Sequence, residues 1–364
     1  MIPLIVDLET EWRGGQNQAL LLLKGLYERG HAAELVAAKG SSLHHRALKA
    51  NICVHHVSRG MLQLPAAAKI WTTLRDGRID LLHANEAHAV TASWLAAASY
   101  KVPFVISRRV GYPLGRGRIA QARYRAASCI IANSKWVAEQ AAASGAPQEK
   151  LRVVYEGVQI PDRTSPEQRM AARHRWGMTG DAPLLGCVGV LLPDKGQEWL
   201  IRAMVEIRKE FTRARLLLAG DGPLRKELEA LAKTLGLAEA VIFAGFVKDV
   251  ESVYAALDLF LLPSFFEALN NSLLAAMAHE IPSIAFRRGA LAEIIENGQS
   301  GLMVSGPEVG EICAAVARIL RDREFARRLG EAGRTRVAEN FSADRMVERT
   351  AEIYDELLRA RSAI

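Results

Sequence analysis

Short apolar runs with the length of β-strands alternate with amphipathic segments with the length of helices along almost the whole chain. Such alternation predicts parallel sheets covered by helices on both faces, because each parallel strand needs a crossover segment before the next. The alternation occurs twice, which predicts two doubly wound α/β domains. The expected strands are residues 4–8, 33–37, 81–83, 104–107, 129–132 and 153–155, then 184–188, 215–219, 240–243, 259–262, 283–285 and 301–304.

The boundary between the two domains is expected at residues 160–166, where two prolines, Asp, Thr and Ser have the composition of a linker. The first domain would cover residues 1–160 and the second 161–341, which are ordinary domain sizes for a chain of 364 residues. From about residue 342 the chain has one long helical pattern, because its apolar residues recur at three- and four-residue spacing.

Open parallel sheets bind ligands in the loops at the carboxyl ends of their strands, and two such domains facing each other would form a cleft. In the second domain, Gly189 opens a loop in which Lys195 precedes a helix, so that its charge would neutralise a diphosphate. Glu267 follows a buried strand. The next helix begins with polar residues that cap it and offer N–H groups to phosphate, namely Asn270, Asn271 and Ser272.

Two loops of the first domain also follow strands. Gly14 and Gly15 precede a helix and would let a ligand approach its positive end, although a glycine pair is also common in ordinary turns. His83, Glu86 and His88 follow another strand. Hydrogen bonding to a substrate is favoured over metal ligation there, because the remaining ligands of a metal site are not evident.

Positive charge is concentrated in the first domain. Residues 1–160 hold 20 Lys and Arg against 11 Asp and Glu, whereas the rest holds 27 against 29. Such an excess suits phosphate, nucleic acid or an anionic membrane, or is a merely solvated face. Nucleic acid is the poorest of these, because few aromatic residues are interleaved. The excess peaks in an acid-free run that contains Lys101, Arg108, Arg109, Arg116, Arg118, Arg123 and Arg125.

The compartment expected from the sequence is the cytoplasm. The four cysteines are scattered in apolar surroundings, which favours buried free thiols over disulfides or zinc. No run approaches the roughly 20 apolar residues of a membrane-spanning helix. The first residues have the pattern of a strand rather than of a signal peptide.

Taken together, these loops resemble those of the retaining glycosyltransferases of family 4, which have the two-domain GT-B fold. Gly14 and Gly15 are similar to the family's N-terminal loop, residues 189–196 to its diphosphate loop, and residues 219–223 to its second-domain turn. Glu267 is similar to the start of its glutamate motif. The helix over 342–364 resembles the one that crosses back onto the first domain. Residues 243–247, which include Gly245, Phe246 and Val247, resemble the family's loop whose backbone meets the nucleobase.

The resemblance implies a hexosyltransferase that moves a sugar from a UDP-, GDP- or ADP-sugar with retention of configuration. No DxD motif is present, so no metal or other cofactor is expected. Lys195, the amides of Gly14 and Gly15 and the helix start near Asn270 would stabilise the departing diphosphate. Glu267 would hold the donor sugar, and His83 would line the sugar side of the cleft by its main chain or ring.

The acceptor implied by the resemblance is a glycan or glycolipid that enters from the first domain. Residues 12–15 and 108–110 are similar to enzymes of bacterial lipopolysaccharide or related cell-surface glycan synthesis. The basic run would attach the protein peripherally to the cytoplasmic face of an anionic inner membrane. The residues expected on the acceptor side are Arg13, Glu86, His88, Arg108 and Arg109.

Three residues depart from the family pattern. Ala275 stands where the motif has its second glutamate, which binds the ribose hydroxyls, and the loss of such bonds costs about 1.5–3 kcal/mol. Val190 replaces a frequent basic residue, and Asn270 stands where glycine is common. Two alternatives therefore stay open: a GT-B sugar-nucleotide epimerase, and a non-catalytic protein that binds a nucleotide sugar or an anionic glycan.

Overall fold

The structure is a computed structural model, and it describes residues 1–58, 63–115 and 117–362. The chain separates into two compact units. Unit 1 consists of Met1–Gly157 together with Ser342–Ile364, and unit 2 of Val158–Phe341. The division falls a few residues before the linker composition at residues 160–166.

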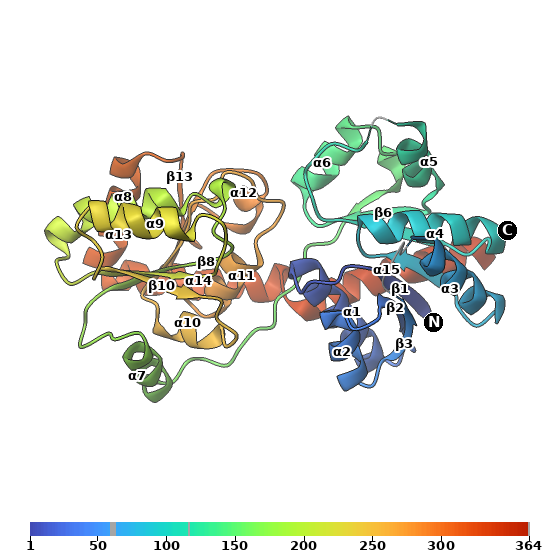
Figure 1. The fold of residues 1–364 in the computed structure, drawn as a ribbon, viewed down its shortest axis with the longest axis horizontal. Coiled ribbons are helices and arrows are strands. Elements are labelled where there is room, and N and C mark those ends of the chain that lie inside the picture. Colours follow the sequence, from blue (N-terminus) through green and yellow to red (C-terminus); the bar gives the residue numbers. More distant parts are fainter. Residues whose placement is uncertain (59–62, 116, 363–364) are drawn as a thin grey trace. The chain divides into compact units, whose positions relative to one another are not determined.

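Unit 1 is built on a parallel sheet of seven strands in the order β3-β2-β1-β4-β5-β6-β7 (Figure 1). The strand order reverses direction between β1 and β4, as it does in doubly wound sheets. The central strands are buried and mainly apolar because helices cover both of their faces. The strands are β1 (Pro3–Asp7), β2 (Glu34–Ala38), β3 (Cys53–Val57), β4 (Leu81–Ala84), β5 (Phe104–Arg108), β6 (Cys129–Ala132) and β7 (Leu151–Val153).

Two apolar cores flank this sheet. One contains side chains of α1, α2 and α15, and the other contains side chains of α3, α4, α5 and α6. The final helix therefore belongs to the same unit as the first strand, and its red ribbon lies with the blue and cyan elements in Figure 1. The helices are α1 (Gly14–Glu28), α2 (Ser42–Lys49), α3 (Gln63–Arg75), α4 (Ala87–Tyr100), α5 (Arg118–Ala126), α6 (Lys135–Ala143) and α15 (Ala343–Ser362).

Unit 2 repeats the design with a parallel sheet of six strands in the order β10-β9-β8-β11-β12-β13. The order again reverses direction, here between β8 and β11. The carboxyl ends of these two central strands therefore mark the expected binding edge of this sheet. The strands are β8 (Leu184–Val188), β9 (Arg215–Ala219), β10 (Val241–Gly245), β11 (Leu259–Leu262), β12 (Ser283–Phe286) and β13 (Leu302–Val304).

Helices also cover both faces of the second sheet. In Figure 1, α8, α9 and α13 lie on one face, and α7 and α10 lie on the other. Buried leucines and isoleucines of α8 and α13 form one core with β8, β9 and β11. The helices are α7 (Pro166–Arg175), α8 (Gln197–Glu210), α9 (Arg225–Thr234), α10 (Glu251–Ala256), α11 (Asn271–Ala278), α12 (Leu291–Ile294), α13 (Val309–Arg321) and α14 (Arg323–Asn340).

Two strands of unit 1 differ from the expectation. β3 was not expected, because its sequence Cys-Val-His-His-Val is too polar to have the pattern of a strand with two buried faces. It pairs on one side with β2 and is the edge strand of the sheet. β7 begins at Leu151 rather than 153, because Leu151 is the residue that pairs with Ile130 of β6.

Within the described ranges, no helix combines the length and the apolar character that crossing a bilayer requires. The four cysteines are free thiols; Cys129 and Cys187 are buried as expected, whereas Cys53 is exposed and Cys313 is half-buried.

Candidate active site

The loops at the carboxyl edge of the second sheet are packed tightly against one another. Gly196 has a φ of +65°, and a Cβ there would lie 2.3 Å from the carbonyl oxygen of Pro263. Gly289, with a φ of +52°, would bring a Cβ within 2.1 Å of the carbonyl oxygen of Glu267. Both positions therefore require glycine. The loops after β8, β11 and β12 are consequently held against one another by backbone contacts.

Lys195, Glu267 and Asn270 meet at this edge. The Lys195 ammonium lies 2.9 Å from Oε1 of Glu267, and the Asn270 amide donates to the same oxygen at 3.0 Å. Glu267 is 6% exposed, and its own carbonyl oxygen accepts from the Ala290 N–H at 3.0 Å. Lys195 and Glu267 are thus far apart in the sequence but form one partly buried ion pair. The side chain of Lys195 is about a quarter exposed.

The charges of this pair are stabilised by their neighbours. Burial opposes the charge on Lys195, but the carboxylates of Glu267 and Asp194 outweigh it and hold the pKa of that ammonium above its usual range. The neighbouring thiol of Cys187 is the opposite case, because burial and then the Glu267 charge raise its pKa to about 12. Lys195 is therefore a permanent cation at neutral pH, and Cys187 is an inert thiol.

The start of α11 lies beside this pair. Asn270 is the N-cap, and its side-chain oxygen accepts from the Leu273 N–H at 2.8 Å. Asn271 and Ser272 form the first turn, and the positive end of a helix favours an anion. Ala275 is half-buried on the following turn and brings no carboxylate to the helix surface.

Four further residues expected at the donor site lie at the carboxyl ends of β8 and β10. A Cβ at Gly189 would meet no described atom within 4 Å. Gly245 has a φ of +66° and ends β10, and its carbonyl oxygen accepts from Gly220 at 2.8 Å. Phe246 follows with 82% of its surface exposed, beside a half-buried Val247. An aromatic ring so exposed offers a flat apolar surface to a ligand.

Sequence reasoning missed Arg287 and Arg288. Both side chains are exposed directly after β12, one step before Gly289, whose backbone packs on Glu267. They bring two guanidinium groups to the same edge as Lys195. The available signal was a basic pair followed by glycine at the carboxyl end of a buried strand, which is where α/β sheets place their ligand contacts.

In unit 1, a buried carboxylate holds the glycine loop at the start of α1. Asp7 ends β1 and is fully buried. It accepts from the Asn85 amide at 2.6 Å and from the Gln16 amide at 3.0 Å. Asn85 also donates to the Gly15 carbonyl oxygen at 3.1 Å. Gly14 is the first residue of α1, and Arg13 is its N-cap. The backbone N–H of Arg13 donates to the side-chain oxygen of Gln16.

Asp7, which was not among the expected site residues, forms no ion pair with any cation in the described part of the chain, and amide side chains hold it instead. Burial raises the pKa of its carboxyl, and hydrogen bonds from Asn85, Gln16 and the backbone N–H of Glu9 oppose the rise in part. Its signal in the sequence was an acid at the end of the first strand. The Asp7, Asn85 and Gln16 side chains form a rigid support beneath Gly14 and Gly15.

Arg109 is the basic side chain that lies over this loop. Its Nε is 3.0 Å from the Glu156 carboxylate, and its Nη1 donates to the carbonyl oxygen of Asn85. Its Cδ would be 3.9 Å from a Cβ at Gly15. Arg13, by contrast, is exposed and pairs with Glu11 at 2.5 Å. The structure thus brings Arg109 and Gly15 together and leaves the Arg13 side chain at the surface.

The ring of His83 is not where a sugar would reach it. It is 1% exposed and lies between the Tyr354 hydroxyl at 2.5 Å and the Ser107 hydroxyl at 2.8 Å. Burial, followed by the charge of Arg109, lowers the pKa of this imidazole to about 3, so it is neutral at physiological pH. The expectation for its ring is corrected accordingly: His83 joins β4 to the final helix, and it borders a cavity of about 20 Å³, which has room for one water.

Glu86 and His88 have different surroundings. Glu86 is the N-cap of α4 and accepts from the backbone N–H groups of Ala89 at 2.7 Å and Leu8 at 3.2 Å. Burial and the nearby Asp7 raise the pKa of its carboxyl. His88 lies in the first turn of the same helix with an exposed side chain. Glu86 is therefore occupied with the helix start, and His88 faces solvent.

The basic run does not form one continuous face. Arg108 is 9% exposed, and it donates to the carbonyl oxygen of Tyr112 and to the Tyr124 hydroxyl. The expectation that it faces an acceptor is therefore corrected: it secures the turn after β5. Arg123 similarly donates to the Thr91 hydroxyl. Arg116 lies outside the described residues. The exposed cations of the run are Lys101, Arg118 and Arg125.

Family models match both units of the chain. A model of glycosyltransferase family 4 matches residues 12–160, and a model of glycosyl transferases group 1 matches residues 182–322. The two matches follow each other without overlap and together cover most of the chain.

Curated relatives carry the names of several glycosyltransferases. A GDP-mannose-dependent phosphatidylinositol monomannoside mannosyltransferase of Mycolicibacterium smegmatis is 32% identical over 241 residues, which is 63% of this chain and 63% of that protein. The chain thus spans less than two thirds of that relative's length. The lipopolysaccharide core glycosyltransferase LpsE of Rhizobium meliloti is 29% identical over 265 residues, covering 71% of this chain and 73% of LpsE.

Solved structures show the same fold at low sequence identity. Anabaena Alr3699/HepE in complex with UDP has a TM-score of 0.86 at 23% identity, covering 98% of this chain and 100% of that one. A glycosyltransferase from Rickettsia africae has a TM-score of 0.87 at 20% identity, covering 98% of both chains. The two parallel sheets are those of the GT-B fold, and with a family model matched to each unit the chain belongs to glycosyltransferase family 4.

Proposed function

We propose that this protein transfers a sugar from a nucleotide diphosphate sugar to a glycan or glycolipid acceptor with retention of configuration, in the synthesis of a cell-surface glycan. The observation that carries the proposal is the grouping of Lys195, Glu267 and the start of α11 at the carboxyl edge of the second sheet. A donor with a diphosphate and a hydroxylated sugar needs a cation, the positive end of a helix and a carboxylate close to one another. The UDP and GDP-mannose in the names of relatives and structural neighbours are donors or products of this class.

The proposed chemistry follows from where charge develops. Cleavage of the bond to the sugar leaves negative charge on the diphosphate, and Lys195 together with the positive end of α11 would stabilise it. Arg287 and Arg288 supply further positive charge at the same edge. These groups make a metal-independent reaction feasible. Glu267 would accept hydrogen bonds from the sugar hydroxyls, with Asn270 holding its carboxylate in place.

Unit 1 is proposed to bind the acceptor and to contact an anionic membrane. Arg118 and Arg125 are exposed around α5, and the apolar side chains of Val110, Tyr112 and Ile119 are 41%, 61% and 66% exposed. Exposed apolar groups beside cations are the combination that holds proteins at an anionic bilayer. The double variant Arg118→Glu/Arg125→Glu should lose binding to anionic liposomes, whereas Lys226→Glu/Lys248→Glu in unit 2 should not. Equal binding by both would contradict this part of the proposal.

A non-catalytic binding protein is the second candidate, and Ala275 favours it. Without a carboxylate on that turn of α11, the site has fewer groups to hold a nucleoside. The distinction is kinetic: a binding protein would retain donor without releasing nucleotide when acceptors are added. A sugar-nucleotide epimerase would release nucleotide or convert the sugar without any acceptor.

The deciding experiment is a panel of UDP-, GDP- and ADP-sugars measured by calorimetry and by acceptor-dependent nucleotide release. Lys195→Ala should lower turnover about 10²–10³-fold, because it removes one preorganised charge from the leaving group. Lys209→Ala is the matched control, since Lys209 is an exposed lysine of α8 paired with Glu206. Binding of no nucleotide sugar would contradict the proposal, as would equal turnover by the two lysine variants.

A further inference from the structure

Glu34, Cys53 and His55 form a group of side chains at the amino edge of the first sheet, away from the loops that follow its strands. Glu34 begins β2 and Cys53 begins β3, and these two residues are paired in the parallel register. His55 is two residues further along β3, and alternate residues of a strand point to the same face. The register therefore places all three side chains on one face of the sheet.

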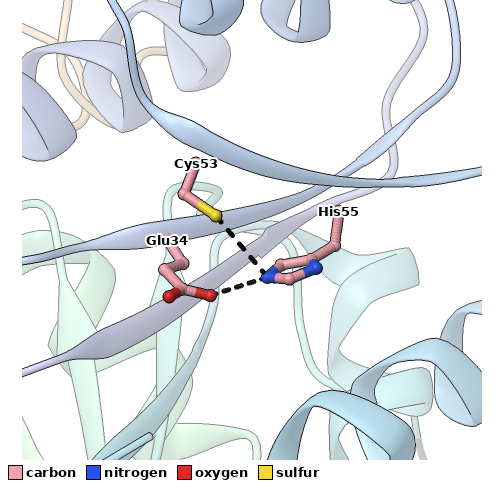
Figure 2. Close-up of side chains that lie close together, drawn as sticks. All are labelled: Glu34, Cys53 and His55. Atoms are coloured by element: carbon pink, nitrogen blue, oxygen red, sulfur yellow. Dashed lines mark hydrogen bonds and ion pairs between the residues drawn. The ribbon is translucent and has the colours of Figure 1, made fainter. Parts of the chain in front are cut away.

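The three side chains converge on one point, as Figure 2 shows. Nε2 of His55 lies 2.6 Å from Oε2 of Glu34 and 4.0 Å from Sγ of Cys53. One ligand atom from each residue lies within 4.8 Å of the other two, and within the described part of the chain no other group of three His, Cys, Asp or Glu meets this condition. Glu34 is 4% exposed, whereas Cys53 is open to solvent, so a metal ion has a route in.

We propose that Glu34, Cys53 and His55 bind a zinc ion, with solvent in the fourth position. A thiolate, an imidazole and a carboxylate are the ligands that zinc takes in proteins. Ligand atoms of a tetrahedral site lie roughly 3.3–3.6 Å apart, which follows from bonds of about 2.0–2.3 Å. The pair at 2.6 Å must open slightly and the pair at 4.0 Å must close slightly. Rotation of the exposed Cys53 side chain is enough for the second change.

Arg78 is the neighbour that decides how Glu34 would act. Its guanidinium pairs with Oε1 of Glu34, which leaves Oε2 directed at His55. This is the arrangement in which a second residue orients a ligating carboxylate. Lys69 and Asp76 also act on His55 electrostatically, with opposite signs. The Cys53 thiolate and the Glu34 carboxylate together carry two negative charges, which would balance the charge of the ion beside the nearby cations.

The consequence of this site would be structural. β3 is one of the two edge strands of the sheet, and among the described residues it pairs only with β2. An ion held by Glu34 of β2 and by Cys53 and His55 of β3 would link the two strands through their side chains. The site lies at the opposite end of the strands from Asp7 and Gly15, so it is distinct from the ligand loops of this unit.

The test is a titration of the full-length reduced protein with Co²⁺ and then Zn²⁺. Co²⁺ should produce a thiolate-to-cobalt charge-transfer absorption at one equivalent, and Zn²⁺ should abolish it. Zn²⁺ in excess should raise the melting temperature by about 5–10 °C, as expected for an ion at ~100 times its dissociation constant. Cys53→Ser should lose the absorption and the shift, and His55→Gln should weaken binding at least about 10-fold.

Two matched controls separate this site from other metal binding. Cys313→Ser removes a half-buried thiol of unit 2, and His56→Gln removes the histidine on the opposite face of β3, which contacts His44. Both variants should behave like the parent protein. No charge-transfer absorption in the parent, or an unchanged absorption in Cys53→Ser, would overturn the proposal. Metal binding that is lost in His56→Gln and retained in Cys53→Ser would assign the ion to the histidines of the other face.

Discussion

The carboxyl edges of the two sheets both hold a buried carboxylate beside a glycine loop, but they neutralise it differently. Asp7 of unit 1 is held by the amides of Asn85 and Gln16, whereas Glu267 of unit 2 is held by the Lys195 ammonium and by Asn270. The first arrangement fixes a loop. The second places a cation beside the carboxylate at the edge that is proposed to bind the donor. The same fold therefore holds one carboxylate by amides and the other by an ion pair.

The glycines show the same contrast. A Cβ at Gly15 would meet Arg109 at 3.9 Å, which is ordinary van der Waals contact. A Cβ at Gly289 would collide with the backbone of Glu267. The glycine of unit 1 leaves room above the loop, and the glycine of unit 2 is required by the packing beneath it.

The largest expected effect breaks this comparison directly. Gly289→Ala should destabilise the protein by at least ~3 kcal/mol, because it combines a positive φ with a backbone collision. Gly15→Ala should change stability by less than about 1 kcal/mol, since alanine is favoured within a helix. Urea unfolding followed by circular dichroism measures both. If Gly15→Ala nevertheless abolishes turnover, the open space above the loop serves a ligand. Equal destabilisation by the two variants would refute the contrast.

Ala275→Glu should have the next largest effect, and it sharpens the account of unit 2. A carboxylate on the second turn of α11 would offer charge-assisted hydrogen bonds worth about 1.5–3 kcal/mol to a nucleoside. Donor affinity should rise about 10–100-fold, which calorimetry with the nucleotide sugar that binds would show. Ala314→Glu, at an exposed position of α13 in the same unit, is a control for the added charge. Affinity that falls in the Ala275 variant would mean that the ligand occupies this position differently.

The smallest expected effect concerns pH and unit 1. Because burial raises the pKa of Asp7 above its unfolded value, the stability it contributes is present at low pH and is lost as pH rises through the folded pKa. Asp7→Asn removes this dependence of stability on pH. It also places an amide N–H₂ group near the amide donors of Asn85 and Gln16. The difference in unfolding free energy between parent and variant should therefore change between pH 4 and 7. A difference that is constant over this range would contradict the raised pKa.

The alternation of strands and helices was readable from the sequence because most strands of both sheets are buried and consist mainly of apolar residues. β3 was missed for the same reason, since an edge strand with Cys53, His55 and His56 has no continuous apolar run. Glu267, Lys195 and Asn270 were found because each lies in a loop after a strand. The contact between these side chains was not predicted, because no spacing in the sequence relates residues 195 and 267.

The direction of a side chain was the least predictable property. His83 and Arg108 lie near the carboxyl ends of β4 and β5, where binding residues are expected, yet both point into the unit. Their partners explain this: Tyr354 comes from the final helix, and Tyr112 and Tyr124 follow the strand. A basic run in a sequence shows the charge of its residues. It does not show which guanidinium groups donate hydrogen bonds to neighbouring carbonyl oxygens.

The hydrogen bond between His83 and Tyr354 has a consequence for how the chain is made. One of the two cores of unit 1 is completed by Met346, Val347, Ile353 and Tyr354 of α15. A ribosome that has synthesised residues 1–157 has therefore produced a sheet with one face partly uncovered. At 5–20 residues per second, roughly 10–40 s pass before α15 is made. Every residue of unit 2 is synthesised before α15, so the core of unit 1 cannot be completed until all of unit 2 has been made.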